Sequence, residues 1–115
     1  MNSAQDENGA EAQYMLAKIQ FDQGLHNQSN ETLYDLNTRF GGQSYWIGKS
    51  FLLVTDNYIK LDELFQARAT LKSIIENAPE EEIVAEAKEK LTILDQVQEE
   101  ELVEQDSLEI EVVDN

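Results

Sequence analysis

Apolar residues recur at steps of three and four along most of this chain, the spacing that places side chains on one face of a helix. This pattern predicts five helices and an all-α fold. The single proline, the few glycines and the abundance of leucine, alanine and glutamate agree with helix rather than strand. Two helices are expected to form a hairpin over residues 10–40, two more a hairpin over 44–77, and the fifth a capping helix over 79–104.

Residues that favour helix ends mark the boundaries between these predicted helices. Gly24 can adopt the positive φ that ends a helix, and Ser44 and Asp62 can cap the third and fourth helices with their side chains. Pro79 suits the first turn of the fifth helix, where its missing N–H removes no hydrogen bond. In the first helix, the stripe that we expect to pack consists of Ala12, Leu16 and Ile19.

The two ends of the chain lack this helical spacing. Residues 1–9 are polar and are expected to form a flexible leader. Residues 105–115 carry a block of carboxylates, which favours a solvated acidic tail. The same segment alternates apolar and polar residues at Leu108, Ile110 and Val112, so an extended segment that docks on another surface is the alternative.

A weak internal repeat runs through the body of the chain. The run from Tyr14 to Leu36 recurs 38 residues later as the run from Leu52 to Ile74. A third unit begins with the fifth predicted helix. A period in the thirties is typical of stacked helical hairpins, which usually present a binding surface rather than catalytic groups.

These residues resemble the tetratricopeptide repeat family, in which a large and a small apolar residue in one helix meet a small residue that opens the next. The resemblance implies a right-handed stack of antiparallel helical hairpins, an α-solenoid of about two and a half repeats within residues 10–98. Gln20 and Thr55 depart from the family pattern, which usually has an aromatic and a small residue there. The positions expected to pack the repeats together are Leu16, Ala17, Gly24, Ser29, Leu33, Leu36, Val54, Tyr58, Ala67, Leu71, Ile74 and Pro79.

In this family the first helix of each hairpin lines a concave groove, so the resemblance implies a groove for a peptide or protein partner. The residues expected to line it are Tyr14, Lys18, Phe21, Lys49, Leu52, Asp56 and Ile59. The alternative for Phe21, Leu52 and Ile59 is a place in the core, because apolar residues at helical spacing usually pack. The family's clamp for a terminal carboxylate is disfavoured, since only Lys18 and Lys49 could contribute to it. The sequence of the repeats is also similar to that of bacterial repeat proteins, many of them associated with the cell envelope.

The chain of 115 residues has a formal net charge of −16, which is unevenly distributed. Residues 1–90 carry 15 acidic and 8 basic groups, or −7, whereas residues 91–115 carry 9 acidic groups and no basic ones, or −9. An acidic chain repels phosphate backbones, so direct nucleic-acid binding is not expected. No apolar run reaches the roughly 20 residues of a membrane span, so no membrane insertion is expected.

The chain has no cysteine, which excludes disulfides and thiolate chemistry and leaves the compartment open. It could work in the cytoplasm or, if a signal sequence was removed upstream, in the periplasm or cell envelope.

No arrangement of side chains in the sequence points to catalysis, a metal site or a cofactor. His26 is the lone histidine and is expected to be a solvated turn residue. Acidic runs at the helix ends are typical of solvated faces. We therefore predict a non-enzymatic interaction or scaffold module that binds a peptide or protein partner. The alternatives are an end-cap of a longer repeat array with further repeats upstream, a self-associating domain and, less favoured, an acidic mimic of nucleic acid.

Overall fold

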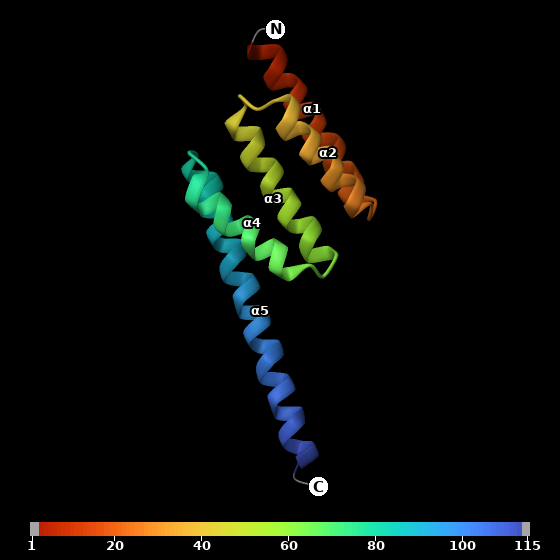
Figure 1. The fold of residues 1–115 in the computed structure, drawn as a ribbon, viewed down its shortest axis with the longest axis vertical. Coiled ribbons are helices and arrows are strands. Elements are labelled where there is room, and N and C mark those ends of the chain that lie inside the picture. Colours follow the sequence, from red (N-terminus) through yellow and green to blue (C-terminus); the bar gives the residue numbers. More distant parts are fainter. Residues whose placement is uncertain (1–2, 114–115) are drawn as a thin grey trace.

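The fold consists of helices joined by short turns (Figure 1). The computed structural model describes residues 3–113, with side chains for residues 6–105. No strand occurs in these residues, so the prediction of an all-α fold is confirmed. The helices are α1 (Ser3–Asp22), α2 (His26–Arg39), α3 (Ser44–Lys60), α4 (Leu64–Asn77) and α5 (Glu81–Val113).

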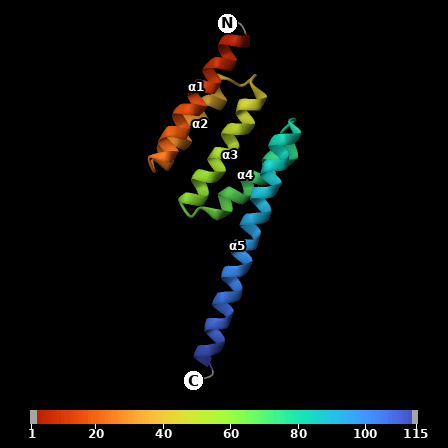
Figure 2. The same cartoon turned by 180° about the vertical axis from the view of Figure 1, so that it is seen from behind.

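The helices pack in the order in which they follow one another along the chain. α1 and α2 form one antiparallel hairpin, α3 and α4 form a second, and the first half of α5 packs on α4 (Figures 1 and 2). α2 packs on α3, α1 also contacts α3, and α3 contacts α5. The second half of α5 projects from this body in both views, which gives the molecule extents of 70 × 29 × 17 Å.

The two hairpins turn with the same backbone geometry, 38 residues apart. Gly24 has φ of 79° and Asp62 has φ of 58°. After each of them, the next amide donates to the carbonyl five residues earlier, at 2.9 Å after Gly24 and 2.8 Å after Asp62. This pair of positive φ and long-range turn bond is the Schellman ending of a helix. Asp62 was expected to cap α4 through its side chain; instead it ends α3, and Glu63 precedes α4 without a side-chain cap bond.

Asp62→Gly is expected to raise the free energy of unfolding by about 0.5–1 kcal/mol, because a glycine adopts positive φ without steric cost. Gly24→Asp is expected to lower it by a similar amount, since the same strain would be introduced into the other hairpin. Urea unfolding followed by circular dichroism measures both. Asp62→Ala is the control: it removes the carboxylate and retains the strain, so a gain in that variant would contradict the backbone explanation.

The other predicted caps also have different roles in the structure. Ser44 is the first residue of α3 rather than its cap, and its hydroxyl donates to a carboxylate oxygen of Glu80 at 2.6 Å. Pro79 lies two residues before α5 begins. Ser44 therefore ties the start of α3 to the turn that leads into α5.

Two clusters of buried apolar side chains form the core. The first lies between α3, α4 and α5 and the second between α1, α2 and α3. Leu71 is fully buried in the first cluster and Leu33, its counterpart 38 residues earlier, in the second. Most of the expected packing positions are buried; these are Ala17, Ser29, Leu33, Leu36, Val54, Ala67, Leu71 and Ile74, with Tyr58 half-buried.

The predicted packing stripe of α1 is wrong. Leu16 is 49% exposed and Ile19 is 53% exposed, whereas Ala10 and Ala17 are fully buried. α1 carries two apolar stripes, and only the one with small residues faces α2, where the Ser29 hydroxyl donates to the carbonyl of Ala17 at 2.8 Å. The stripe of small residues is the one buried against α2, because small side chains let the two helices approach closely.

The predicted leader is also wrong, because α1 begins at Ser3. Ala10 is buried, and Gly9 lies so close to the ring of Phe40 that an added Cβ would meet a ring carbon at 2.7 Å. Residues 3–9 thus extend a helix whose following turn packs on α2. Residues 1 and 2 lie outside the described part of the chain.

The predicted acidic tail is helical as far as Val113, so residues 105–113 continue α5. The backbone runs away from the four preceding helices, and it does not return to cover a groove on them (Figures 1 and 2). Glutamate, leucine and glutamine favour helix, and this local preference outweighs the period-two spacing of the apolar residues. The side chains of Leu108, Ile110 and Val112, on which the docking alternative rested, lie outside the described side chains.

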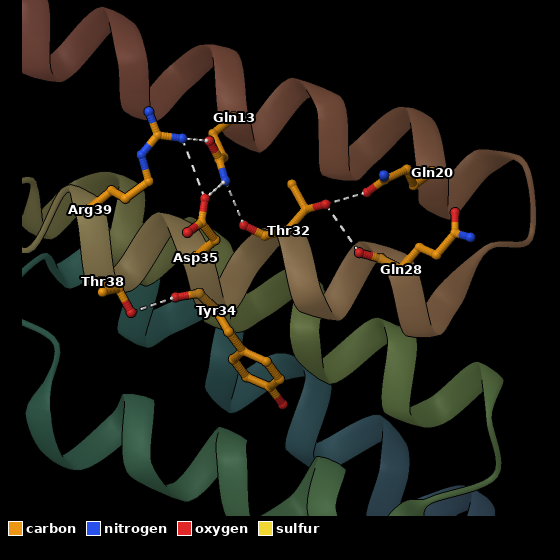
Figure 3. Close-up of polar contacts among 8 residues, drawn as sticks. All are labelled: Gln13, Gln20, Gln28, Thr32, Tyr34, Asp35, Thr38 and Arg39. Atoms are coloured by element: carbon orange, nitrogen blue, oxygen red, sulfur yellow. Dashed lines mark hydrogen bonds and ion pairs between the residues drawn. The ribbon is translucent and has the colours of Figure 1, made fainter.

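A strip of polar contacts joins α1 to α2 along the surface (Figure 3). The amide of Gln13 donates to the carbonyl of Thr32 at 3.0 Å and to Asp35 at 2.7 Å. Arg39 donates to the amide oxygen of Gln13 at 3.1 Å, and the Thr32 hydroxyl donates to Gln20 at 2.7 Å. These bonds fix the register of α1 on α2 along this surface.

Asn57 joins the two hairpins from a fully buried position on α3. Its amide nitrogen donates to the Ser29 hydroxyl at 2.9 Å and to the side-chain oxygen of Asn30 at 3.0 Å. Its amide oxygen lies 2.9 Å from Nδ1 of His26, so that ring nitrogen carries the proton. His26 is therefore a partly buried hairpin contact, with its ring edge-on to Phe21 at 5.0 Å, and not a solvated turn residue.

Candidate partner-binding surface

α3 contacts α1 on one side of the molecule and α5 on another. On α1, Tyr14 and Phe21 are partly buried against the cluster of Ala17, Leu33, Leu53 and Val54. Lys18 lies with its ammonium 4.9 Å from the centre of the Phe21 ring and 3.3 Å from a carboxylate oxygen of Asp22. Of the predicted groove residues on α1, Tyr14 and Phe21 thus pack partly on the core, and Lys18 lies at the surface.

An aromatic group occupies the space between α1 and the start of α3. The ring of Trp46 lies 5.6 Å from that of Tyr14 and 5.1 Å from that of Tyr45, and the ammonium of Lys49 lies 5.7 Å from the Tyr14 ring centre. Burial raises the pKa of the Tyr14 phenol, and the negative charges of Glu86 and Asp56 raise it further. Tyr14 therefore remains neutral, and Lys49 is held over its ring.

Leu52 does not line the groove. It is only 3% exposed and packs with Ala67, Leu71 and Ile83 in the core cluster that α5 completes. The prediction of a binding role for Leu52 is wrong, because α5 covers this position of α3.

Asp56 faces Lys90 of α5 across the groove. The ammonium lies 3.0 and 3.3 Å from the two carboxylate oxygens, and the side chains of Lys90 and Asp56 are 26% and 32% exposed. Lys90 was not expected here, because the predicted groove residues came from the first two units alone. The sequence repeat extends into the fifth predicted helix, where Lys90 lies. Extending the predicted groove to that helix could have identified Lys90.

Exposed apolar side chains surround this ion pair. Ile59 is 36% exposed, and on α5 Ile93 is 52% and Val97 43% exposed. Together with the ion pair they line a groove of 410 Å³. Its lining residues are Asp56, Ile59, Asp62, Leu64, Lys90, Ile93, Leu94, Val97 and Glu101. We call this the α3–α5 groove; it combines apolar anchors with one charged pair and two further carboxylates.

Within the residues that the structure describes, no three histidine, aspartate or glutamate side chains gather as a metal site would require. None of the described helices is both long and apolar enough to cross a membrane.

Comparison with known proteins adds no relative. No protein-family model, no curated protein and no solved structure matches this chain. Its function is inferred from its own residues.

Proposed function

We propose that this protein is a non-enzymatic interaction module that binds a peptide or protein partner in the α3–α5 groove. The observation that carries the proposal is the arrangement of three exposed apolar side chains, Ile59, Ile93 and Val97, around the Asp56–Lys90 pair. Exposed apolar side chains gathered in one groove are typical of a surface that a partner covers.

The helix packing supports the assignment to a tetratricopeptide-like, right-handed stack of about two and a half repeats. Each helix packs on the next, and each first helix also contacts the first helix of the following unit. The shared turn geometry at Gly24 and Asp62 has the same spacing as the sequence repeat. In such a stack the first helices line one continuous face, which would place the partner across α3 and α5.

The charges of the groove favour a basic and apolar partner. Asp56 and Lys90 neutralise each other, whereas the carboxylates of Asp62 and Glu101 at the rim leave a negative balance. A partner segment with Leu or Ile side chains and a nearby Lys or Arg would complement both features. Burying one such side chain stabilises the complex by roughly 1.5–3 kcal/mol.

Ile93→Asp is expected to weaken partner binding at least tenfold, because it places a charge where an apolar side chain must be desolvated. A photo-crosslinking amino acid incorporated at position 93 in the cell that expresses the protein would identify the partner. Calorimetry then measures the affinity of the purified partner for each variant. Thr38→Asp, on the exposed outer side of α2, is the matched control and should leave the affinity unchanged. Equal affinity in both variants would exclude the groove as the binding site.

A second function, stacking on another helical unit or on a second copy, is favoured by the outer face of α1. Met15, Leu16 and Ile19 are each about half exposed there, at 50%, 49% and 53%. The residues 38 positions later, Leu53, Val54 and Asn57, are buried beneath α2. The repeat thus leaves on α1 a helix-packing face that no described part of the chain covers.

The double substitution of Asp for Met15 and Leu16 is expected to abolish concentration-dependent self-association and to change the free energy of unfolding by less than about 0.5 kcal/mol. Sedimentation velocity at 0.15 and 0.5 M salt, where the repulsion between acidic chains is screened, measures the association. A chain that stays monomeric at every concentration, or a variant that still associates, would contradict self-association through this face.

A further inference from the structure

The two hairpins end differently at one equivalent position. Phe40 and Ala78 are both the residue at which a second helix stops, and their amides donate to the carbonyls of Leu36 and Ile74 at 2.8 and 2.9 Å. In the first hairpin the ring of Phe40 lies against Gly9 of α1. In the second hairpin the equivalent residue is Ala78, which has no ring.

The second hairpin has a pocket where the first has this ring. The pocket has a volume of 240 Å³ and lies between the start of α3, the end of α4 and the turn that leads to α5. Ile47 takes the position of Gly9 and fills part of the space, but its side chain is smaller than that of phenylalanine. The pocket is lined by Ser44, Ile47, Gly48, Phe51, Ser73, Ile74, Asn77, Ala78 and Pro79. Its walls are thus mainly apolar, with Ser44, Ser73 and Asn77 as polar members.

A carboxylate without a full set of donors lies beside this pocket. One oxygen of Glu80 accepts the hydroxyl of Ser44 at 2.6 Å. The other oxygen, Oε2, is buried and has no hydrogen-bond donor among the side chains that the structure describes. The neighbouring residues Glu81 and Glu82 add further negative charge at the surface. A buried carboxylate oxygen is stabilised by a donor, and a cationic donor would also balance this local charge.

We propose that this pocket binds an aromatic side chain of a peptide partner, with an adjacent lysine or arginine of the same peptide pairing with Glu80. The aromatic ring is argued from Phe40, which fills the equivalent place in the first hairpin, and the cation from the unpartnered oxygen of Glu80. The pocket lies at the start of α3, whereas the α3–α5 groove lies at its end, and the two share no lining residue. The proposal therefore stands apart from the groove.

The experiment uses the full chain and three capped dipeptides, N-acetyl-Phe-Lys-amide, N-acetyl-Phe-Glu-amide and N-acetyl-Ala-Lys-amide. Titrations are followed by the backbone amide shifts of Gly48, Ser73 and Ala78. The Phe-Lys peptide is expected to shift these amides, the Phe-Glu peptide to bind about fivefold more weakly, and the Ala-Lys peptide not to bind. The fivefold figure corresponds to one partly exposed ion pair, about 1 kcal/mol.

Substitutions then assign the contacts. Ala78→Phe should abolish binding by filling the pocket as Phe40 does, and Ser73→Phe should do so from an exposed helix position even if the first variant folds poorly. Glu80→Gln should remove the preference for Phe-Lys over Phe-Glu. Ile93→Asp, in the groove, is the control and should leave all three titrations unchanged.

Any of the following results would contradict the proposal. Absence of shifts at these amides with tens of millimolar Phe-Lys peptide, or undiminished shifts in both pocket-filling variants, would exclude the pocket as a site for an aromatic side chain. Equal binding of Phe-Lys and Phe-Glu would exclude the pairing with Glu80. A loss of dipeptide binding in Ile93→Asp would show that the shifts arise from the groove instead.

Discussion

Asn57→Leu is expected to lower the free energy of unfolding by about 2–3 kcal/mol, although leucine has the same branched shape as asparagine and the site is fully buried. The substitution removes three contacts at once, those to Ser29, Asn30 and His26. The Ser29 hydroxyl keeps its bond to the carbonyl of Ala17. The loss therefore falls mainly on Asn30 and His26, which would be left as buried or partly buried polar groups without this partner.

Urea unfolding monitored by circular dichroism at two or more wavelengths measures this change. Asn77→Leu is the control, because Asn77 is exposed and its amide bonds only within its own helix, to the carbonyl of Ser73 at 2.9 Å. That variant should stay within about 0.5 kcal/mol of the unchanged protein. A stability gain in Asn57→Leu would mean that the apolar contact outweighs the network, as happens in some buried polar sites.

The hydrogen bonds of Asn57 are also expected to determine the register in which the two hairpins pack. Asn57 occupies the position that corresponds to Ile19, 38 residues earlier in the sequence repeat. A single buried polar residue beside buried apolar neighbours such as Leu53 and Val54 restricts a helix to the one register in which its hydrogen-bond partners are met. We therefore expect Asn57→Leu to broaden the amide spectrum of α2 and α3 as well as to reduce stability.

Leu71→Ala is expected to lower the free energy of unfolding by about 3 kcal/mol, the usual cost of a fully buried leucine including the cavity that remains. Leu71 lies in the core cluster that α3, α4 and α5 form together. Because three helices surround the side chain, we expect them to close little of the cavity that alanine would leave. Leu33→Ala, 38 residues earlier in the second cluster, should cost a similar amount. Differential scanning calorimetry and urea unfolding measure both variants.

The comparison of these two variants also tests whether the hairpins fold together. α2 packs on α3, and each core cluster includes residues of α3, so both substitutions should shift one common transition. Two separate transitions, with each variant affecting one of them, would contradict this expectation. Leu102→Ala is the control, because Leu102 is 62% exposed on the projecting part of α5 and should change stability by less than about 0.5 kcal/mol.

Periodic apolar residues predicted the helices of the body well, because steps of three and four over a dozen residues leave few alternatives. The same reasoning failed where a helix carries two apolar stripes. On α1, Leu16 and Ile19 are larger than Ala10 and Ala17, so hydrophobicity alone favoured the stripe that turns out to be exposed. Only the requirement for close approach to α2, seen at Ala17 and Ser29, identifies the buried one.

Site residues were harder to predict, because the burial of a side chain depends on which other helix packs over it. Leu52 and Tyr14 occupy equivalent positions in the repeat, yet Leu52 is buried because α5 packs over it, and Tyr14 is only partly buried. The groove pairs Asp56 with Lys90, two residues 34 positions apart. That pairing requires knowing how α5 lies on α3, which a pattern within one helix does not contain.

The projecting half of α5 acts as a stalk. A helix rises about 1.5 Å per residue, so the stretch from Gln98 to Val113 holds the C-terminal end of α5 about 22 Å beyond the packed body. Immobilisation through that end would leave the groove, the pocket and the outer face of α1 all accessible to a probe in solution. Attachment through the other end would place the support directly beside α1, and would hide the stacking face that Met15, Leu16 and Ile19 form.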